Sequence, residues 1–144
     1  MRFAAFLLAV APLVAASTPP TFYKDVLPVL QKNCQTCHRP GEAAPMSLLT
    51  YEQSRPWAKA IRTAVLQRSM PPWFADPAFG KFHNERRLND AEIQTLTAWA
   101  DAGAPAGKSK DAPKPVEFLE GWNIGKPDAV FEMAESFEVP ASGT

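Results

Sequence analysis

The sequence is poor in cysteine and in net charge, and each shortage excludes a class of protein. Only two cysteines occur in 144 residues, and they stand three positions apart, so a disulfide framework does not stabilise this chain. The 15 basic residues balance the 15 acidic ones, which gives no charge excess to attract nucleic acid or an anionic membrane. After residue 16 no apolar run approaches the roughly 20 residues of a membrane-spanning helix. We therefore expect neither nucleic acid nor a membrane as a partner of the mature chain.

Proline, in contrast, is abundant. The 15 prolines are about twice the usual share, which favours loops over long helices. Hydrophobic residues make up 46% and charged residues 21% of the chain, as in ordinary globular proteins. The length suits one compact domain with a smaller part attached.

Residues 1–16 have the pattern of an export signal. Arg2 supplies a positive charge, residues 3–14 are apolar, and Val14-Ala15-Ala16 offers the small residues that a signal peptidase recognises. An uncleaved membrane anchor is the alternative, but the run is short for a span. We expect an exported protein, periplasmic or extracellular, with cleavage near Ser17.

Two well-marked helices are expected near the ends of the main domain. Asp25 can cap a first helix that runs to about Asn33. Asn89 and Glu92 form a capping-box pattern for the last helix, which Gly103 ends.

A third helical region lies between these two. Thr50 and Gln53 match a capping box, Pro56 interrupts the helix, and a restart is expected near Arg55. Residues 69–87 follow as a long irregular loop, and such loops in small domains are usually functional.

The predicted organisation is an all-α domain followed by a different kind of segment. Residues 17–107 form the helical domain, and 108–115 have the composition of a linker. Residues 116–144 contain strand-like stretches at 129–133 and 137–139. Because two short strands cannot bury a core alone, we expect 116–144 to be the start of a truncated, β-rich second domain.

The sequence from Cys34 to His38 is C-x-x-C-H, the attachment signature of c-type haem. Two thiols on one turn can each reach a vinyl group of one porphyrin, and His38 can then ligate the iron. A thioredoxin-type pair is an alternative, but it would follow a strand and open a helix. Zinc is another, but it prefers four ligands and only His83 remains as a strong one. We predict one covalent haem c.

The second axial ligand of the iron has several candidates. Met70 is preferred, because it follows a helix and two prolines stiffen the chain behind it. Met46 is very close to His38 in sequence, Met133 lies in the second segment, and His83 is the remaining alternative.

The stretch from about Thr21 to Gly107 resembles a class I cytochrome c domain. The resemblance is carried by Cys34-x-x-Cys37-His38, by Met70-Pro71 and by the helix pattern Leu88-x-Asp90-x-Glu92-Ile93-x-x-Leu96-x-x-Trp99. It implies that His38 and Met70 are the axial ligands and that Trp99 packs near the haem. It also implies that a proline carbonyl, here that of Pro45, accepts the His38 Nδ1–H. The interval from His38 to Met70 is short for the family.

A narrower resemblance concerns residues 70–88 (MPPWFADPAFGKFHNERRL) and 121–133 (GWNIGKPDAVFEM). They are similar to haem domains fused ahead of copper-type, ascorbate-dependent monooxygenase-like domains in exported bacterial proteins. This implies a redox partner protein or a fused redox domain as the partner. No cluster of copper ligands occurs in the sequence after residue 116.

The function predicted from these residues is electron transfer rather than catalysis. A His/Met pair leaves the iron no open position, and no carboxylate pair, triad or phosphate-binding loop indicates an enzyme. The alternatives are a haem-based enzyme or gas sensor, which needs an open or displaceable distal site, and a haem with a purely structural role.

Overall fold

The structure is a computed structural model that describes residues 18–119 and 126–142. The expected export signal, 1–16, lies outside the described residues. The helical elements are the π-helical turn η1 (Phe22–Val26), α1 (Leu27–Asn33), α2 (Tyr51–Ser54), η2 (Arg55–Trp57), α3 (Ala58–Leu66), η3 (Pro77–Phe79), α4 (Asp90–Asp101) and η4 (Ser109–Asp111). In the part of the chain that the structure describes, no helix has the length and apolarity needed to cross a membrane.

The prediction of a β-rich second part is wrong. Residues 126–142 contain no strand among the described positions. Their apolar side chains remain exposed, as at Phe131 (95%) and Val139 (79%). An alternating pattern becomes a strand only where a neighbouring strand supplies hydrogen bonds and an apolar face to cover. The described fold is all-α.

The first helix begins three residues before the predicted cap, at Phe22. Asp25 lies inside its first turn, where Oδ2 accepts hydrogen bonds from Thr21 N (2.7 Å) and Thr21 Oγ1 (3.1 Å). The Leu27 N–H reaches back five residues to the Phe22 carbonyl, which widens the turn. Pro28 follows directly, and a proline ring presses on the carbonyl four residues earlier in an ordinary helix. The π-helical turn provides the space for this ring.

The predicted caps of the other helices are confirmed. The Thr50 hydroxyl accepts from Gln53 N, and Gln53 Oε1 accepts from Thr50 N. Asn89 and Glu92 make the same reciprocal pair at 2.9 Å in each direction. The expected interruption at Pro56 is also present, because the proline lies in η2, between α2 and α3.

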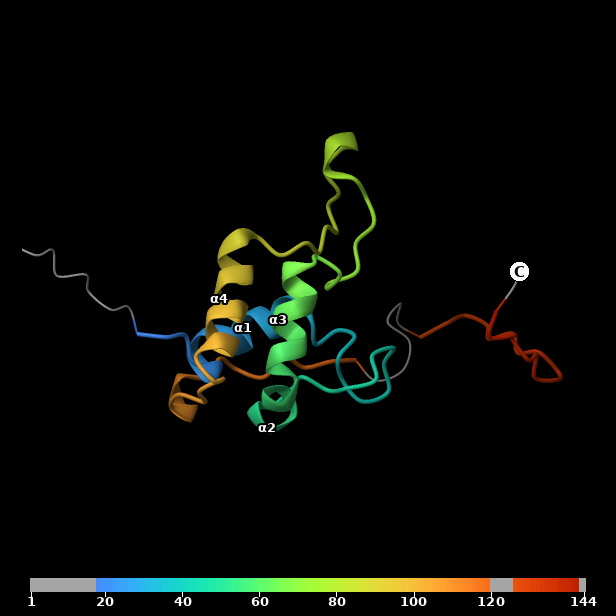
Figure 1. Cartoon of the computed structure of the whole chain (residues 1–144). Coiled ribbons are helices and arrows are strands. Elements are labelled where there is room, and N and C mark those ends of the chain that lie inside the picture. The colour runs from blue at the N-terminus through green and yellow to red at the C-terminus, as the bar shows by residue number, and fades with distance from the viewer. Residues whose placement is uncertain (1–17, 120–125, 143–144) are drawn as a thin grey trace, which may run out of the picture.

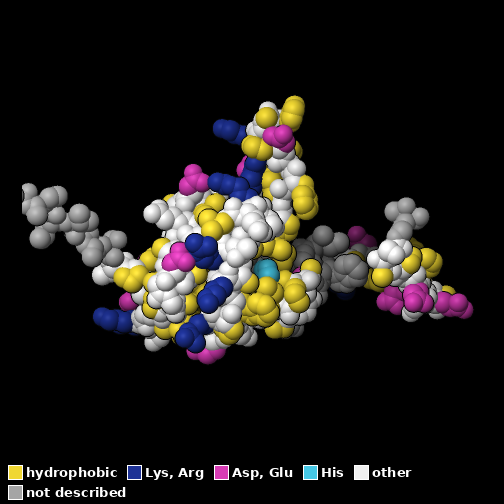
Figure 2. Space-filling model, in the orientation of Figure 1, with side chains coloured by type: hydrophobic (Ala, Val, Ile, Leu, Met, Phe, Trp, Pro, Cys, Tyr) yellow, Lys and Arg dark blue, Asp and Glu magenta, His cyan; other side chains and the backbone are white. Residues whose placement is uncertain are grey.

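The core lies where α3 and η1 pack against α4. Figure 1 shows α1, α3 and α4 gathered in one body, from which residues 72–87 project as an arm. Buried side chains from all of these helices form one cluster, which consists of Phe22, Val26, Leu27, Leu30, Leu48, Ala58, Ile61, Val65, Leu88, Leu96, Trp99 and Ala104. Figure 2 shows hydrophobic side chains along the arm and Lys and Arg side chains scattered over the body.

The chain after α4 returns to the helical body. The Pro105 carbonyl accepts from Phe22 N (2.9 Å) and from Trp99 Nε1 (3.0 Å). The Tyr51 hydroxyl donates to the Ala104 carbonyl (2.9 Å). These three hydrogen bonds join residues 104 and 105 to η1, α4 and α2.

Residues 104–119, which we call the strap, continue along α1. They include the predicted linker, 108–115. Gln31 Nε2 donates to the Lys114 carbonyl at 3.0 Å, and the Arg39 guanidinium lies 4.4 Å from the centre of the Phe118 ring. The strap thus runs from the start of the first helix to the residue after His38.

Candidate functional site

The end of α1 and the turn that follows it bring both thiols and the imidazole together. Cys34 is the C-terminal cap of α1. Its carbonyl accepts from Cys37 N (3.1 Å) and His38 N (2.9 Å), so the three residues occupy a single turn. The thiols are not joined in a disulfide.

A cavity of about 560 Å³ opens beside this turn. Cys34, Cys37, His38 and Asn33 line it on one side, and residues 43–46, 70–73 and Arg86 complete the walls. A smaller cavity of about 170 Å³ extends it into the core between α3 and α4, and both are lined by Cys34, His38, Met46, Met70 and Pro71. Both spaces have mainly apolar walls. Cofactor pockets commonly have volumes of about 300–1,000 Å³, so the larger cavity can receive a sizeable apolar group.

The orientation of His38 is set by a backbone carbonyl. Its Nδ1 lies 3.2 Å from the Met46 carbonyl oxygen. A carbonyl only accepts hydrogen bonds, so in the neutral ring Nδ1 carries the proton and Nε2 keeps its lone pair for a metal. A histidine ligand of a metal is normally held in this way.

The predicted partner of His38, the Pro45 carbonyl, is wrong by one residue. Ala44 N donates to the Cys37 carbonyl (3.2 Å), and this bond fixes the path of the loop. On that path the next residue, Met46, presents its carbonyl to the imidazole. Pro45 is exposed and only lines the cavity.

Gln35 is a supporting residue that the sequence did not reveal. Its side chain is buried at 2% exposure, and Nε2 donates to the Leu48 carbonyl at 2.9 Å. Leu48 N in turn donates to the His38 carbonyl (2.9 Å). These bonds hold the loop 39–48 against the turn that contains Cys34, Cys37 and His38. The signature leaves position 35 open, so no sequence signal marked it.

Met70 reaches the site because α3 ends in a sharp turn. Arg68 has the left-handed backbone conformation (φ 54°), and Ser69 N donates to the Ala64 carbonyl at 3.0 Å. Such a turn reverses the chain at the end of a helix. Met70 then lines both cavities and stays 44% exposed.

The other candidate ligands are placed less well. His83 is exposed on the arm and is not among the residues that line the two cavities. Met133 is 69% exposed in the segment 126–142. Met46 lines both cavities, but its own carbonyl is the one bonded to His38, so its backbone lies beside the imidazole.

Trp99 does not line the cavities, contrary to what the resemblance implied. Its side chain is fully buried, donates from Nε1 to the Pro105 carbonyl and packs against Phe22 at 6.0 Å between ring centres. Leu96, three residues earlier on α4, lines the smaller cavity instead. Trp99 thus connects the core to the strap.

Burial raises the pKa of the Cys34 thiol from 9.0 to about 12, with smaller contributions from the charges of Glu92 and Cys37. Redox-active and metal-binding cysteines act as thiolates and have lowered pKa values. The shift at Cys34 has the opposite sign. This argues against the thiol-redox alternative.

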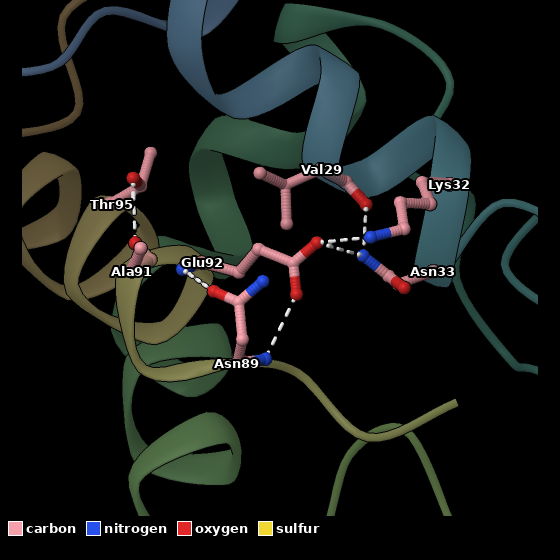
Figure 3. A network of polar contacts seen from close by, with 7 residues as sticks. All are labelled: Val29, Lys32, Asn33, Asn89, Ala91, Glu92 and Thr95. Carbon is pink, nitrogen blue, oxygen red and sulfur yellow. Dashed lines mark hydrogen bonds and ion pairs between the residues drawn. The ribbon is translucent and has the colours of Figure 1, made fainter. Parts of the chain in front are cut away.

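Glu92 connects the start of α4 to the end of α1 (Figure 3). Its Oε1 accepts from Lys32 Nζ (2.8 Å) and from Asn33 Nδ2 (3.3 Å), while Oε2 accepts from Asn89 N. Burial acts to raise the pKa of Glu92, but these hydrogen bonds and the Lys32 charge outweigh it and lower the pKa below 4.5. The start of α4 is therefore joined to the end of α1 by a charged network at the edge of the site.

Searches of protein-family models, curated proteins and solved structures found no match to this chain. The resemblance to class I cytochrome c domains therefore stays a prediction. Among the described residues, no group of three or more His, Cys, Asp or Glu side chains could hold a metal ion by itself.

Proposed function

We propose that this chain is a c-type haem module that transfers single electrons outside the cytoplasm. The observation that carries the proposal is one apolar cavity lined by both cysteines, by His38 and by Met70. This donor set fits one haem c, because the thiols can anchor a porphyrin while nitrogen and sulfur ligate its iron.

Each residue has a defined part in this proposal. Cys34 and Cys37 would hold the porphyrin by adding their thiols to its two vinyl groups, and His38 would offer Nε2 to the iron. The Met46 carbonyl keeps the His38 ring in the required tautomer, at 3.2 Å from Nδ1. When bound, haem supplies a one-electron couple between ferrous and ferric iron.

Met70 makes the proposed site a closed one. If haem is bound, the Met70 thioether would be the second protein ligand of the iron, and it would keep water away and raise the reduction potential. The apolar walls of the cavity act in the same direction, because they disfavour the more highly charged ferric state. A site of this kind exchanges electrons without binding a substrate, so we propose that the chain is not itself an enzyme.

The proposed partner is another redox protein or a redox domain in the same polypeptide. The proposed location, periplasmic or extracellular, follows from the export-signal pattern in residues 1–16.

The attachment is tested by producing the protein in a host that matures c-type cytochromes. Pyridine haemochrome spectra should show two thioether bonds in the wild type and one in Cys37→Ser. Absence of covalent haem from the wild-type protein would contradict the proposal.

The closed site is tested at Met70. Met70→Ala should retain covalent haem, lose the absorption band of His/Met ligation and lower the reduction potential. Met133→Ala is the matched control, because Met133 is exposed and outside the cavity walls. An unchanged spectrum in Met70→Ala would exclude Met70 as the ligand, and ready binding of carbon monoxide by the wild type would favour a haem enzyme or gas sensor.

A further inference from the structure

The last residues of the strap lie against the loop that begins directly after His38. The Arg39 guanidinium lies 4.4 Å from the centre of the Phe118 ring. The arginine side chain is only 13% exposed, and its Nε atom is shielded from solvent. Because little water reaches the guanidinium, its attraction to the ring is stronger than at an open surface. Phe118 is itself half-buried, so the two side chains form an enclosed contact between the strap and the loop.

The same arginine closes the first turn of the loop. Arg39 Nη2 donates to Glu42 Oε1 at 2.6 Å, and Glu42 N donates to the Arg39 carbonyl at 3.3 Å. A planar guanidinium can stack on a ring with its face and bind a carboxylate with its edge. One side chain therefore connects Phe118 to Glu42.

The position of this turn affects the hydrogen bond of His38. Four residues after Glu42, the Met46 carbonyl oxygen lies 3.2 Å from His38 Nδ1. Between them, Ala44 N donates to the Cys37 carbonyl at 3.2 Å. Both distances are at the long end of the favourable range for an N–H donor and an oxygen acceptor, so a small displacement of the loop weakens these bonds. The contact that holds the start of the loop therefore protects the His38 proton.

We infer that Phe118 is a positioning residue for His38: through Arg39, it holds the start of the loop that presents the Met46 carbonyl to the imidazole. Gln35 holds the other end of the same loop. The inference deepens the proposed function and rests on it, because His38 is the proposed histidine ligand of the iron. A hydrogen bond from Nδ1 makes an imidazole a stronger electron donor at Nε2. A ring in the strap thus helps to set the reduction potential of the proposed haem.

The inference is tested in the holoprotein with two variants at one position and a matched control. Phe118→Leu removes the ring but keeps an apolar side chain, whereas Phe118→Tyr keeps a ring that can lie against the guanidinium. The control is Gln31→Ala, which removes another contact of the strap, the hydrogen bond from Gln31 Nε2 to the Lys114 carbonyl, and does not involve Arg39.

A further variant, Glu42→Gln, tests the same device from the loop side, because it removes the charge that Arg39 binds. The measurements are the exchange rate of the His38 Nδ1 proton, by ¹H NMR of the ferrous protein, and the reduction potential.

We expect Phe118→Leu to exchange the His38 proton roughly two- to tenfold faster than the wild type, the factor that corresponds to the loss of one cation–π contact. Its reduction potential should be higher, because a weaker hydrogen bond makes the imidazole a poorer electron donor. Glu42→Gln should change both quantities in the same direction. Phe118→Tyr and Gln31→Ala should match the wild type in both.

If covalent haem is present and Phe118→Leu keeps the wild-type exchange rate and potential, the positioning role is overturned and the proposed function stands. Changes of equal size in Gln31→Ala would assign the effect to the strap as a whole, and changes of equal size in Phe118→Tyr would show that the ring is not its cause. Either result also overturns the inference. If the wild type carries no covalent haem in the pyridine haemochrome assay, the proposed function fails and the inference fails with it.

Discussion

At the scale of single residues, Glu92 connects two helices through its carboxylate. Its carboxylate completes the cap of α4 through Asn89 and binds Lys32 and Asn33 at the end of α1. The side chain is 13% exposed, whereas that of Lys32 is 68% exposed. Solvent therefore screens the ion pair with Lys32, and the hydrogen bonds carry much of the stabilisation.

Replacement of Glu92 should change how stability depends on pH. The pKa of Glu92 is lowered in the folded state, so its stabilisation is complete above the ordinary value of 4.5 and is lost as the pH falls through the folded value. Glu92→Gln keeps a side chain that can cap α4 but loses the charge. We expect a loss of about 1 kcal/mol at neutral pH and a weaker dependence on pH in the acid range.

Urea denaturation followed at a series of pH values measures this effect. Glu52→Gln is the control, because Glu52 is exposed in the first turn of α2. If Glu92→Gln and the wild type lost the same amount of stability on acidification, the network in Figure 3 would not contribute to the pH dependence of stability.

The residues of the site could be predicted from sequence to the extent that a local pattern defines them. The signature placed Cys34, Cys37 and His38 on one turn, and the structure brings Met70 to the same cavity. Which carbonyl faces the imidazole depends on the path of the loop 39–48, and that path is set by hydrogen bonds that no single position encodes. The prediction was therefore wrong by one residue, Met46 in place of Pro45.

At the scale of elements, the strap depends on one glycine. Gly107 has a positive φ of 75°, and a Cβ at this position would lie 2.6 Å from Thr21 Cβ. Thr21 cannot easily move, because its N–H and hydroxyl bind Asp25 at the start of the first helix. The glycine thus allows the strap to pass close to the N-terminus of the helix.

Gly107→Ala should therefore destabilise the protein more than Gly41→Ala. Both glycines have positive φ, but a Cβ at Gly41 would meet nothing within 4 Å. Gly41→Ala carries only the backbone cost of about 1 kcal/mol, whereas Gly107→Ala adds the clash with Thr21. Thermal unfolding of both variants measures the difference, and equal losses would contradict the close approach.

The helices could be predicted from the sequence where the residues that cap them are close neighbours in the chain. Both capping boxes are encoded within four residues, and both are present. The stretches 129–133 and 137–139 also have a local pattern, but a strand needs a partner that the pattern does not supply. The early start of the first helix, at Phe22, likewise depends on a distant contact, because the Phe22 amide donates to the Pro105 carbonyl.

At the scale of the whole molecule, the strap makes residues 104–119 part of the helical fold. A chain that ends after residue 119 should keep the stability of the full chain. A chain that ends after residue 103 loses the hydrogen bonds between the strap and the helical body, among them four that the carbonyls of Ala104, Pro105 and Ala106 accept. At about 0.5–1.5 kcal/mol each, these four alone give an expected loss of roughly 2–6 kcal/mol.

Chemical denaturation of the two shortened chains, with the same cofactor content, checks this expectation. Hydrogen exchange adds a local test, because the Phe22 and Tyr23 amides should lose protection only in the shorter chain. If both shortened chains matched the full chain in stability, the strap would be dispensable to the fold.

The Pro105 carbonyl also has a consequence for the order of events during folding. It closes the fold on Phe22 and Trp99, yet it lies far along the chain from the turn at 34–38. A contact between such distant positions forms late, because a long loop must close first. The two thiols, which are partly enclosed in the finished fold, are therefore more accessible before the strap closes. We expect the proposed attachment of haem to take place on this open chain, before the strap is complete.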